Sequence, residues 1–160
     1  MNQRNTSAPK LTLPPGARYA VAAARFNSEV VEKLVAGAVA GFKQVGLAEK
    51  DYDVVWVPGS FELPLTAQQL ARTSKYAAIV CLGCVIRGDT DHYDYVCRAA
   101  ADGILRVGLD SGLPIIFGVL TCDTLEQALA RAGGELGNKG TDAALAAIEM
   151  AAMLEQIRAS

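Results

Sequence analysis

The sequence lacks most of the features that would assign it to a specialised class of protein. Its 15 lysines and arginines are balanced by 17 aspartates and glutamates, so no surplus of charge attracts nucleic acid or anionic lipid. No uninterrupted apolar run approaches the roughly 20 residues that a membrane-spanning helix needs. The chain also has a single histidine. These absences predict a globular protein that binds neither nucleic acid nor a membrane.

The N-terminus and the cysteines indicate the expected compartment. The first 18 residues, MNQRNTSAPKLTLPPGAR, have no apolar central segment of the kind found in secretory signals. Their content of Pro, Ser, Thr and Asn predicts a loosely held arm over residues 1–16, followed by a single domain over residues 17–160. The four cysteines are therefore expected to be reduced thiols in the cytoplasm.

Short apolar runs alternate with amphipathic segments along the domain. The runs that read as strands are Tyr19–Ala24, Asp53–Val57, Ala77–Val85 and Pro114–Leu120. They are nearly continuous in hydrophobicity, which is typical of strands buried on both faces, as in a parallel sheet. The segments between them repeat apolar residues at the spacing of one helix face. This order predicts an α/β fold of three layers, a four-stranded parallel sheet with helices on both faces.

The last third of the chain predicts two helices joined by a glycine-rich link. Thr124-Leu-Glu-Gln127 is a capping box that begins a short helix, and Gly133-Gly134 ends it. A final helix begins near Thr141, and small and apolar residues cover most of its circumference. Because one sheet cannot cover so much apolar surface, we expect this helix to pack against another subunit as well.

Ligands of parallel α/β sheets bind beyond the carboxyl ends of the strands. The segments expected at that edge are Arg25–Ser28, Pro58–Phe61, Ile86–His92 and Thr121–Asp123. Three of these four segments carry conspicuous polar or aromatic side chains, so they are the place to look for a site.

A metal site is the first interpretation to consider. Cys81-x-x-Cys84, His92 and Cys97 supply the ligand types that bind zinc. However, residues three apart on a strand point to opposite faces, so Cys81 and Cys84 cannot close on one ion without breaking the strand. Buried cysteines usually behave as small hydrophobic residues, and we expect no metal here.

An anion site is the second interpretation. Gly88-Asp89-Thr90 lies where the third strand passes into a helix. Free backbone N–H groups and the helix dipole favour an anion at such a point, and a glycine lets a ligand approach the backbone closely. Asp89 or Thr90 is also expected to cap the helix, which does not exclude anion binding.

Three carboxylates are an objection to that interpretation. Asp89, Asp91 and Asp94 would repel a phosphate unless they face away from it. A compensating cation is therefore needed, and Arg87 and Arg131 are the candidates.

The remaining conspicuous residues leave more than one role open. His92 falls in the first turn of the helix, where it is either a structural hydrogen-bonding group or a proton-transfer residue. Phe26 and Phe61 follow the first two strands, either as core residues or as partners of a planar ring. Glu62 is an ordinary first-turn acid or an acceptor for sugar hydroxyls. Residue chemistry alone predicts a small ligand without naming it.

Five motifs together resemble those of the lumazine synthase family. They are Arg25-Phe-Asn27, Pro58-Gly-Ser-Phe-Glu62, Val85-Ile-Arg-Gly-Asp-Thr-Asp-His-Tyr-Asp94, Pro114-Ile-Ile-Phe-Gly118 and Arg131-Ala-Gly with Gly137-Asn-Lys-Gly140. Their order and spacing match over about residues 18–157. The resemblance implies a flavodoxin-like αβα sandwich and a transferase of riboflavin biosynthesis. It would condense 5-amino-6-(D-ribitylamino)uracil with 3,4-dihydroxy-2-butanone 4-phosphate to 6,7-dimethyl-8-ribityllumazine, phosphate and water, without a cofactor.

The resemblance implies roles for the residues around the ring of the first substrate. Phe26 would stack on the pyrimidine. Backbone groups at Ser60 and Phe61 would hold the ring and the ribityl chain, and Glu62 would accept from the ribityl hydroxyls. Val85–Ile86 would pair with the ring edge through their backbone.

The resemblance also implies how the second substrate is held. Asp89 and Thr90 would offer main-chain N–H groups to the phosphate, and Thr90 its hydroxyl as well. Arg131 would be the cationic partner of the phosphate, and His92 would transfer protons.

Phe117 and Lys139 would complete the site, and Phe117 is expected to come from the neighbouring subunit. Members of the family assemble as pentamers, some of which form icosahedral shells. The short link between the last two helices, Gly133–Gly140, resembles that of shell formers and favours a shell here. Riboflavin synthase is a further candidate partner.

Two rival interpretations remain. One is a flavin- or ribityl-binding carrier, which would need neither the phosphate cation nor the proton-transfer residue. The other is a zinc-dependent regulatory module built on the cysteines, which metal analysis of the purified protein would detect.

Overall fold

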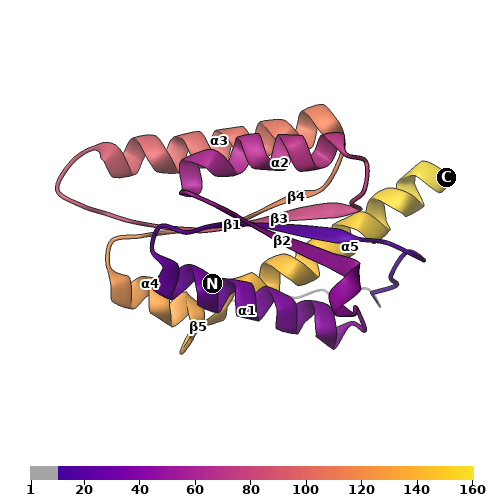
Figure 1. Cartoon of the computed structure of the whole chain (residues 1–160), viewed down its shortest axis with the longest axis horizontal. Helices are drawn as coiled ribbons and strands as arrows, with labels where there is room; N and C mark the ends of the chain where they lie inside the picture. The colour runs from indigo at the N-terminus through magenta and orange to yellow at the C-terminus, as the bar shows by residue number, and fades with distance from the viewer. Residues whose placement is uncertain (1–10) are drawn as a thin grey trace.

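The computed structural model describes residues 11–160, which fold around one parallel sheet (Figure 1). The strands of this sheet are β1 (Tyr19–Ala24), β2 (Tyr52–Val57), β3 (Ala78–Ile86) and β4 (Ile115–Cys122). The helices are α1 (Ser28–Gln44), α2 (Leu63–Arg72), α3 (His92–Ser111), α4 (Leu125–Arg131) and α5 (Lys139–Ala159). Short 3₁₀ turns precede β2 and α2.

The strand order is β2-β1-β3-β4, and all neighbouring pairs are parallel. Helices α2 and α3 cover one face, while α1, α4 and α5 cover the other (Figure 1). The predicted three-layer fold with a four-stranded parallel sheet is therefore confirmed. It follows from the buried, continuous apolar strands: every side chain of β1 is buried, because both of its faces are covered.

The core lies in two parts, one on each face of the sheet. One part joins alternate residues of β1 and β3 to α1 and α5, and includes Tyr19, whose ring centre lies 5.6 Å from that of Phe42. The other part joins the intervening residues to α2 and α3. Leu11 and Leu13, at the end of the predicted arm, pack against the first part. Residues 1–10 of that arm lie outside the described residues.

The segment between α4 and α5 differs from the predicted simple link. It forms a small antiparallel pair, β5 (Ala132–Gly134) and β6 (Gly137–Asn138). Gly133 and Gly137 have positive φ angles of 102° and 80°, a conformation that other residues adopt only with strain. The hairpin therefore needs its glycines.

Helix α5 begins at Lys139, two residues before the predicted start near Thr141. The reason is Asn138, whose Oδ1 accepts from the N–H groups of Gly140 at 2.8 Å and Thr141 at 3.4 Å. Its Nδ2 also donates to Lys33 O at 3.0 Å, which ties the start of α5 to α1. An asparagine cap is as good as serine or aspartate, so the helix begins there.

Helix α3 also begins differently from the expectation. Its cap is Asp91 rather than Asp89 or Thr90, and the Asp91 side chain makes no capping hydrogen bond. Thr90 lies one residue before the N-cap position, although its Oγ1 accepts a hydrogen bond from His92 N–H at 3.4 Å. His92 is the first residue of the helix.

The contact between α1 and α5 gives a first prediction about stability. A Cβ on Gly140 would overlap the carbonyl oxygen of Leu34, and a main-chain atom cannot move aside as a flexible side chain can. Replacing Gly140 with alanine is therefore expected to lower the free energy of unfolding by about 3 kcal/mol, measured by urea denaturation.

The matched control is Gly108 in α3, where a Cβ would meet its nearest neighbours at 3.6 Å, an ordinary contact. Gly108→Ala is expected to be neutral or to stabilise the helix by up to about 1 kcal/mol. Equal free energies of unfolding for the two variants would contradict this account of the α1–α5 contact.

Candidate active site

A hollow of about 700 Å³ lies at the carboxyl ends of β1, β2 and β3. We call it the histidine hollow. Its lining comes from Phe26–Asn27, Pro58–Glu62 and Cys84–Ile86, together with the start of α3 and the loop before it. It collects most of the predicted site residues: Phe26, Ser60, Phe61, Glu62, Val85, Ile86, Thr90 and His92. Asp89 lies in the same loop, between the lining residues Gly88 and Thr90.

Two aromatic side chains of the histidine hollow are unusually exposed to solvent. Phe26 is 72% exposed and Phe61 is 60% exposed. Aromatic side chains of this size normally bury most of their surface, so the core interpretation of both residues is wrong for the isolated subunit. Both rings are free to contact a ligand.

Ser60 has a packing role. It is 5% exposed, and a Cβ on Gly83 would overlap its Oγ, so strand β3 passes directly behind it. A larger side chain at position 60 would not fit against β3. This tight fit fixes the backbone of the turn from Gly59 to Phe61 in the wall of the hollow.

Asn27 contributes to the site and was missed by the sequence interpretation. Its backbone is left-handed, with φ 60° and ψ 46°, and its Nδ2 donates to Cys84 O at 2.8 Å. The loop after β1 is thereby tied to β3 just before Val85. Asparagine tolerates the left-handed conformation better than most residues. An Asn directly after an aromatic residue at the end of a strand is therefore the sequence feature that could have identified Asn27.

The segment Gly88–Thr90 is exposed, and His92 is exposed beside it at the start of α3. Arg87, one of the two cations suggested by the sequence, is already engaged. Its Nε donates to Asp123 Oδ1 at 2.8 Å, and its Nη1 lies 3.7 Å from Asp94 Oδ1. The cation for an anion at this segment has to come from elsewhere.

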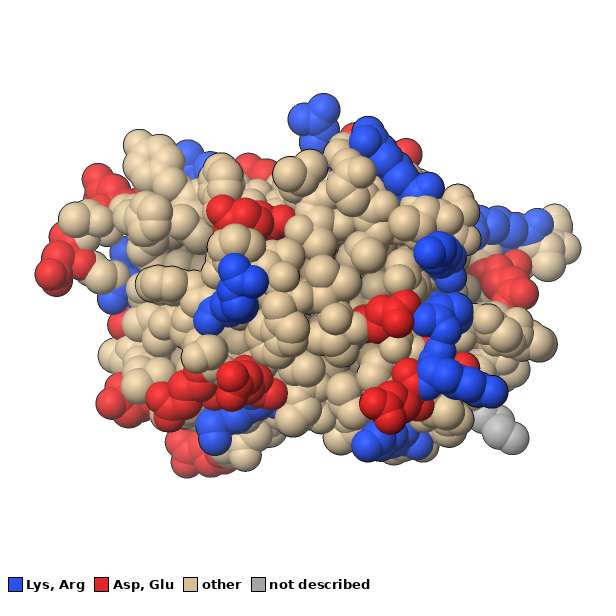
Figure 2. Space-filling model, in the orientation of Figure 1, with Lys and Arg blue, Asp and Glu red and all other residues tan. Residues whose placement is uncertain are grey.

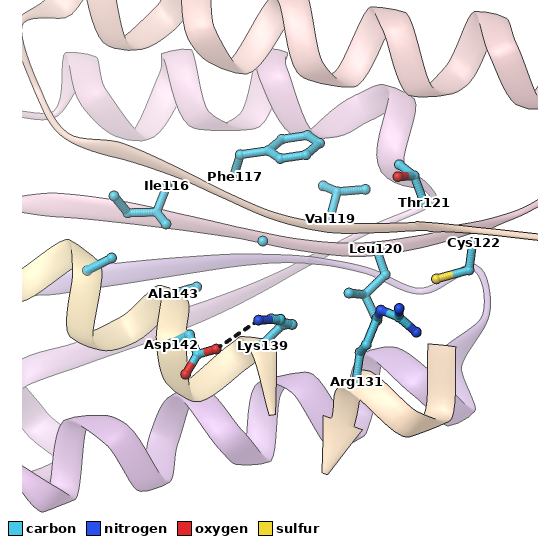
Figure 3. Close-up of a pocket in the computed structure, with 12 residues that line it drawn as sticks. Ile116, Phe117, Val119, Leu120, Thr121, Cys122, Arg131, Lys139, Asp142 and Ala143 are labelled. Carbon is cyan, nitrogen blue, oxygen red and sulfur yellow. Dashed lines mark hydrogen bonds and ion pairs between the residues drawn. The ribbon is translucent and has the colours of Figure 1, made fainter. Parts of the chain in front are cut away.

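A second hollow, of about 450 Å³, lies along β4, which is an edge strand of the sheet. We call it the cation hollow, because Arg131 and Lys139 line it (Figure 3). Lys139 Nζ lies 3.3 Å from Asp142 Oδ2, and Arg131 Nη1 donates to Gln127 O at 2.9 Å. Phe117 lines the same hollow and is 45% exposed.

The structure therefore divides the predicted site residues between two places. Apart from Asp89, which lies in the loop beside the histidine hollow, the predicted residues absent from its lining are Phe117, Arg131 and Lys139, and these three line the cation hollow. Figure 3 shows Arg131 and Lys139 on the α5 side of β4, with the Phe117 ring pointing to the other side. One subunit does not bring the predicted phosphate cation to the predicted phosphate loop.

The cysteines pack as hydrophobic residues. Cys81 belongs to one part of the core and Cys84 to the other, which confirms that they point to opposite faces of β3. Burial raises the pKa of each thiol to about 12. Within residues 11–160, no group of three or more His, Cys, Asp or Glu residues is arranged to hold a metal ion.

These surroundings predict the order in which the thiols react. Cys97 is partly exposed, whereas Cys81, Cys84 and Cys122 are buried. Because the attacking species is the thiolate, iodoacetamide at pH 8 is expected to modify Cys97 first and slowly, since burial raises its pKa too. Mass spectrometry of the digested protein measures this order. Modification of Cys81 in the folded protein at the rate of Cys97 would contradict it.

Comparison with known proteins places the chain in a family. Residues 16–155 match the model of the family described as 6,7-dimethyl-8-ribityllumazine synthase. The chain is 55% identical over 138 residues to the chloroplastic 6,7-dimethyl-8-ribityllumazine synthase of Spinacia oleracea, and 51% identical over 140 residues to that of Arabidopsis thaliana. These matches cover 86% and 88% of this chain, but only 62% of each relative. No helix within residues 11–160 is long and apolar enough to cross a bilayer.

Proposed function

Because the chain belongs to the 6,7-dimethyl-8-ribityllumazine synthase family, we propose that it condenses 5-amino-6-(D-ribitylamino)uracil with 3,4-dihydroxy-2-butanone 4-phosphate. The products are 6,7-dimethyl-8-ribityllumazine, phosphate and water. The observation that carries the proposal is the histidine hollow, where two bare aromatic rings, a carboxylate and the only histidine meet at the carboxyl edge of the sheet. That edge is where sheets of this type bind ligands.

The ring and the ribityl chain of the uracil fit the wall formed by β1, η2 and β3. Phe26 is exposed enough to stack on the pyrimidine, and the backbone at Ser60 and Phe61 is fixed by packing against Gly83. Val85–Ile86 end β3 in the same hollow and present backbone groups to the ring edge. Glu62 is exposed beside them and accepts from the ribityl hydroxyls.

The phosphorylated ketone fits the segment before α3. Main-chain N–H groups of Asp89 and Thr90, and the Thr90 hydroxyl, bind its phosphate at a helix N-terminus, which favours an anion. His92, the first residue of α3, lies two positions after Thr90 and transfers protons between the two substrates. A single subunit leaves this phosphate without a cation, since Arg87 is engaged with Asp94 and Asp123.

We therefore propose that each active site forms between two subunits. The cation hollow of one subunit would face the histidine hollow of its neighbour, so that the neighbour's Arg131 binds the phosphate. Lys139 and Phe117 would arrive with it, because all three line one hollow. The placement of Phe117 on an exposed edge strand supports this arrangement, since 45% of its surface is uncovered in the isolated subunit.

The proposed reaction requires that the two substrates are held in position and that protons are transferred between them. The arylamine of the uracil attacks the ketone carbonyl, and loss of water gives a Schiff base. Elimination of phosphate leaves an enol that tautomerises to a second carbonyl, and the ribitylamino nitrogen attacks this carbonyl to close the ring with loss of another water. No covalent bond to the protein is needed, so the gain comes mainly from holding two reactive molecules together, with effective molarities that reach on the order of 10⁵–10⁸ M. His92 lowers the barriers of the proton transfers.

Mixing the two substrates with the purified protein tests the proposed function. The expected result is growth of lumazine absorbance together with release of one equivalent of phosphate per lumazine formed, faster than in the uncatalysed mixture. A protein that binds the uracil but leaves the uncatalysed rate unchanged would instead be the carrier considered from the sequence. That result would contradict the proposed activity.

We propose that the subunits form pentamers, and that the pentamers assemble into an icosahedral shell. Large apolar side chains stay exposed on the outer surfaces of α3 and α5, including Leu105, Leu109, Met153 and Ile157. Figure 2 shows an uncharged area in the middle of one face, with charged side chains mostly on either side of it. Such surfaces favour contact with other subunits. Light scattering after size-exclusion chromatography measures the assembly, and a bare pentamer would contradict the shell.

A further inference from the structure

Charged side chains form a cluster around Arg87, next to the histidine hollow. Arg87 directly follows β3, and its Nε donates to Asp123 Oδ1 at 2.8 Å. Its Nη1 lies 3.7 Å from Oδ1 of Asp94 in the first turn of α3. The guanidinium carbon lies 4.2 Å from the centre of the Tyr93 ring, which lines the hollow. Arg87 thus joins the ends of β3 and β4 to the start of α3.

The cluster contributes little to the stability of the fold. The side chains of Arg87, Asp94 and Asp123 are 48%, 55% and 64% exposed. Ion pairs so open to water are worth about 0.2–1 kcal/mol each. The stability of the fold therefore does not explain why the Arg87 guanidinium contacts two carboxylates and one aromatic ring.

The position of the two carboxylates gives the cluster a further consequence. Both form ion pairs with Arg87, which immediately precedes Gly88–Thr90, the segment proposed to bind phosphate. Without a cation between them, Asp94 and Asp123 would present two negative charges to an incoming dianion. Repulsion of this kind acts over distances of several ångströms, particularly where water is partly excluded.

We propose that Arg87 is a positioning residue for the phosphorylated substrate. It neutralises Asp94 and Asp123, and so keeps the Gly88–Thr90 segment accessible to an anion. It does not bind the phosphate itself, because its Nε and Nη1 face the two carboxylates and its flat face covers Tyr93. This role rests on the proposed function, which supplies the anion, but it assigns the charge balance of the site to a residue outside the substrate contacts.

The test is a series of variants assayed for both substrates separately. Arg87→Gln is expected to raise the KM for the phosphorylated ketone about tenfold, equivalent to about 1.4 kcal/mol, with the KM for the uracil and kcat changed by less than about twofold. Arg87→Lys keeps the charge and is expected to stay within about threefold of the unmodified protein. Adding Asp123→Asn to Arg87→Gln removes one repelling charge and is expected to recover most of the lost affinity.

Arg106→Gln is the matched control. It removes an arginine from the same helix as Asp94, where Arg106 forms an exposed pair with Asp110 at 3.5 Å. It is expected to change neither KM. An unchanged ketone KM in Arg87→Gln, an equal rise in both KM values, or no recovery with Asp123→Asn would overturn the proposal.

Two further measurements keep the test decisive. If Arg87→Gln does not assemble, Asp123→Asn alone is expected to strengthen competitive inhibition by inorganic phosphate about threefold, and an unchanged inhibition constant overturns the proposal. If the unmodified protein forms no lumazine, the proposed function fails by itself. Calorimetric titration with inorganic phosphate still tests Arg87, because Arg87→Gln is expected to bind it about tenfold more weakly. Equal binding by the two proteins overturns the proposal.

Discussion

Replacing His92 with alanine is expected to slow turnover by about 10²–10⁴-fold without abolishing it. His92 is exposed at the first position of α3 and lines the histidine hollow, so its imidazole is open to a substrate in that hollow. The remaining activity comes from the substrates being held together, which does not depend on this side chain. Steady-state and single-turnover rates of lumazine formation measure the effect.

Two outcomes would contradict this role of His92. One is complete loss of activity in a variant that still assembles like the unmodified protein, since the proposed role of His92 is proton transfer and not an obligatory covalent step. The other is an unchanged rate at saturating substrate, which would leave His92 with a structural role only. Light scattering of the variant is the necessary control for assembly.

Replacing Arg131 with alanine is expected to raise the KM for the phosphorylated ketone about 10- to 100-fold, because a charge-assisted hydrogen bond is worth about 1.5–3 kcal/mol. The KM for the uracil should not change, since Arg131 lies in the cation hollow with Lys139 and not beside Phe26. Kinetics with each substrate varied in turn separate the two constants.

Arg131→Lys serves as the matched control, because it keeps the charge and loses the planar set of donors. It is expected to fall between alanine and the native residue. An unchanged ketone KM in Arg131→Ala would rule out the phosphate role and leave Arg131 as a cap of α4, where Nη1 already donates to Gln127 O.

The fold and most of the histidine hollow could be predicted from residue patterns. Continuous apolar runs such as Tyr19–Ala24 identify strands of a parallel sheet, and a parallel sheet places the following loops at one edge. Strand alternation alone separated Cys81 from Cys84, as their burial in different parts of the core confirms. These inferences depend on the periodicity of apolar residues and on the order of the strands and helices, both of which can be read from the sequence.

The distribution of the cations could not be predicted in this way. Sequence order does not say on which side of β4 the chain continues, and in the structure α4 and the β5–β6 hairpin both lie on the α1 and α5 face. Arg131 and Lys139 therefore reach the cation hollow and not the phosphate segment of their own subunit. The engagement of Arg87 was equally hidden, because its partner Asp123 is 36 positions away in the sequence.

In the proposed assembly, one active site combines the histidine hollow of one subunit with the cation hollow of the next. Mixing His92→Ala with Arg131→Ala subunits under conditions that dissociate and reassemble them tests it most directly. Each variant damages a different hollow, so about one interface in four of a random mixture would combine two intact hollows. At ketone concentrations well below its KM, lumazine formation is expected to rise well above the sum of the two separate variants. Activity equal to that sum after reassembly would contradict a site shared between subunits.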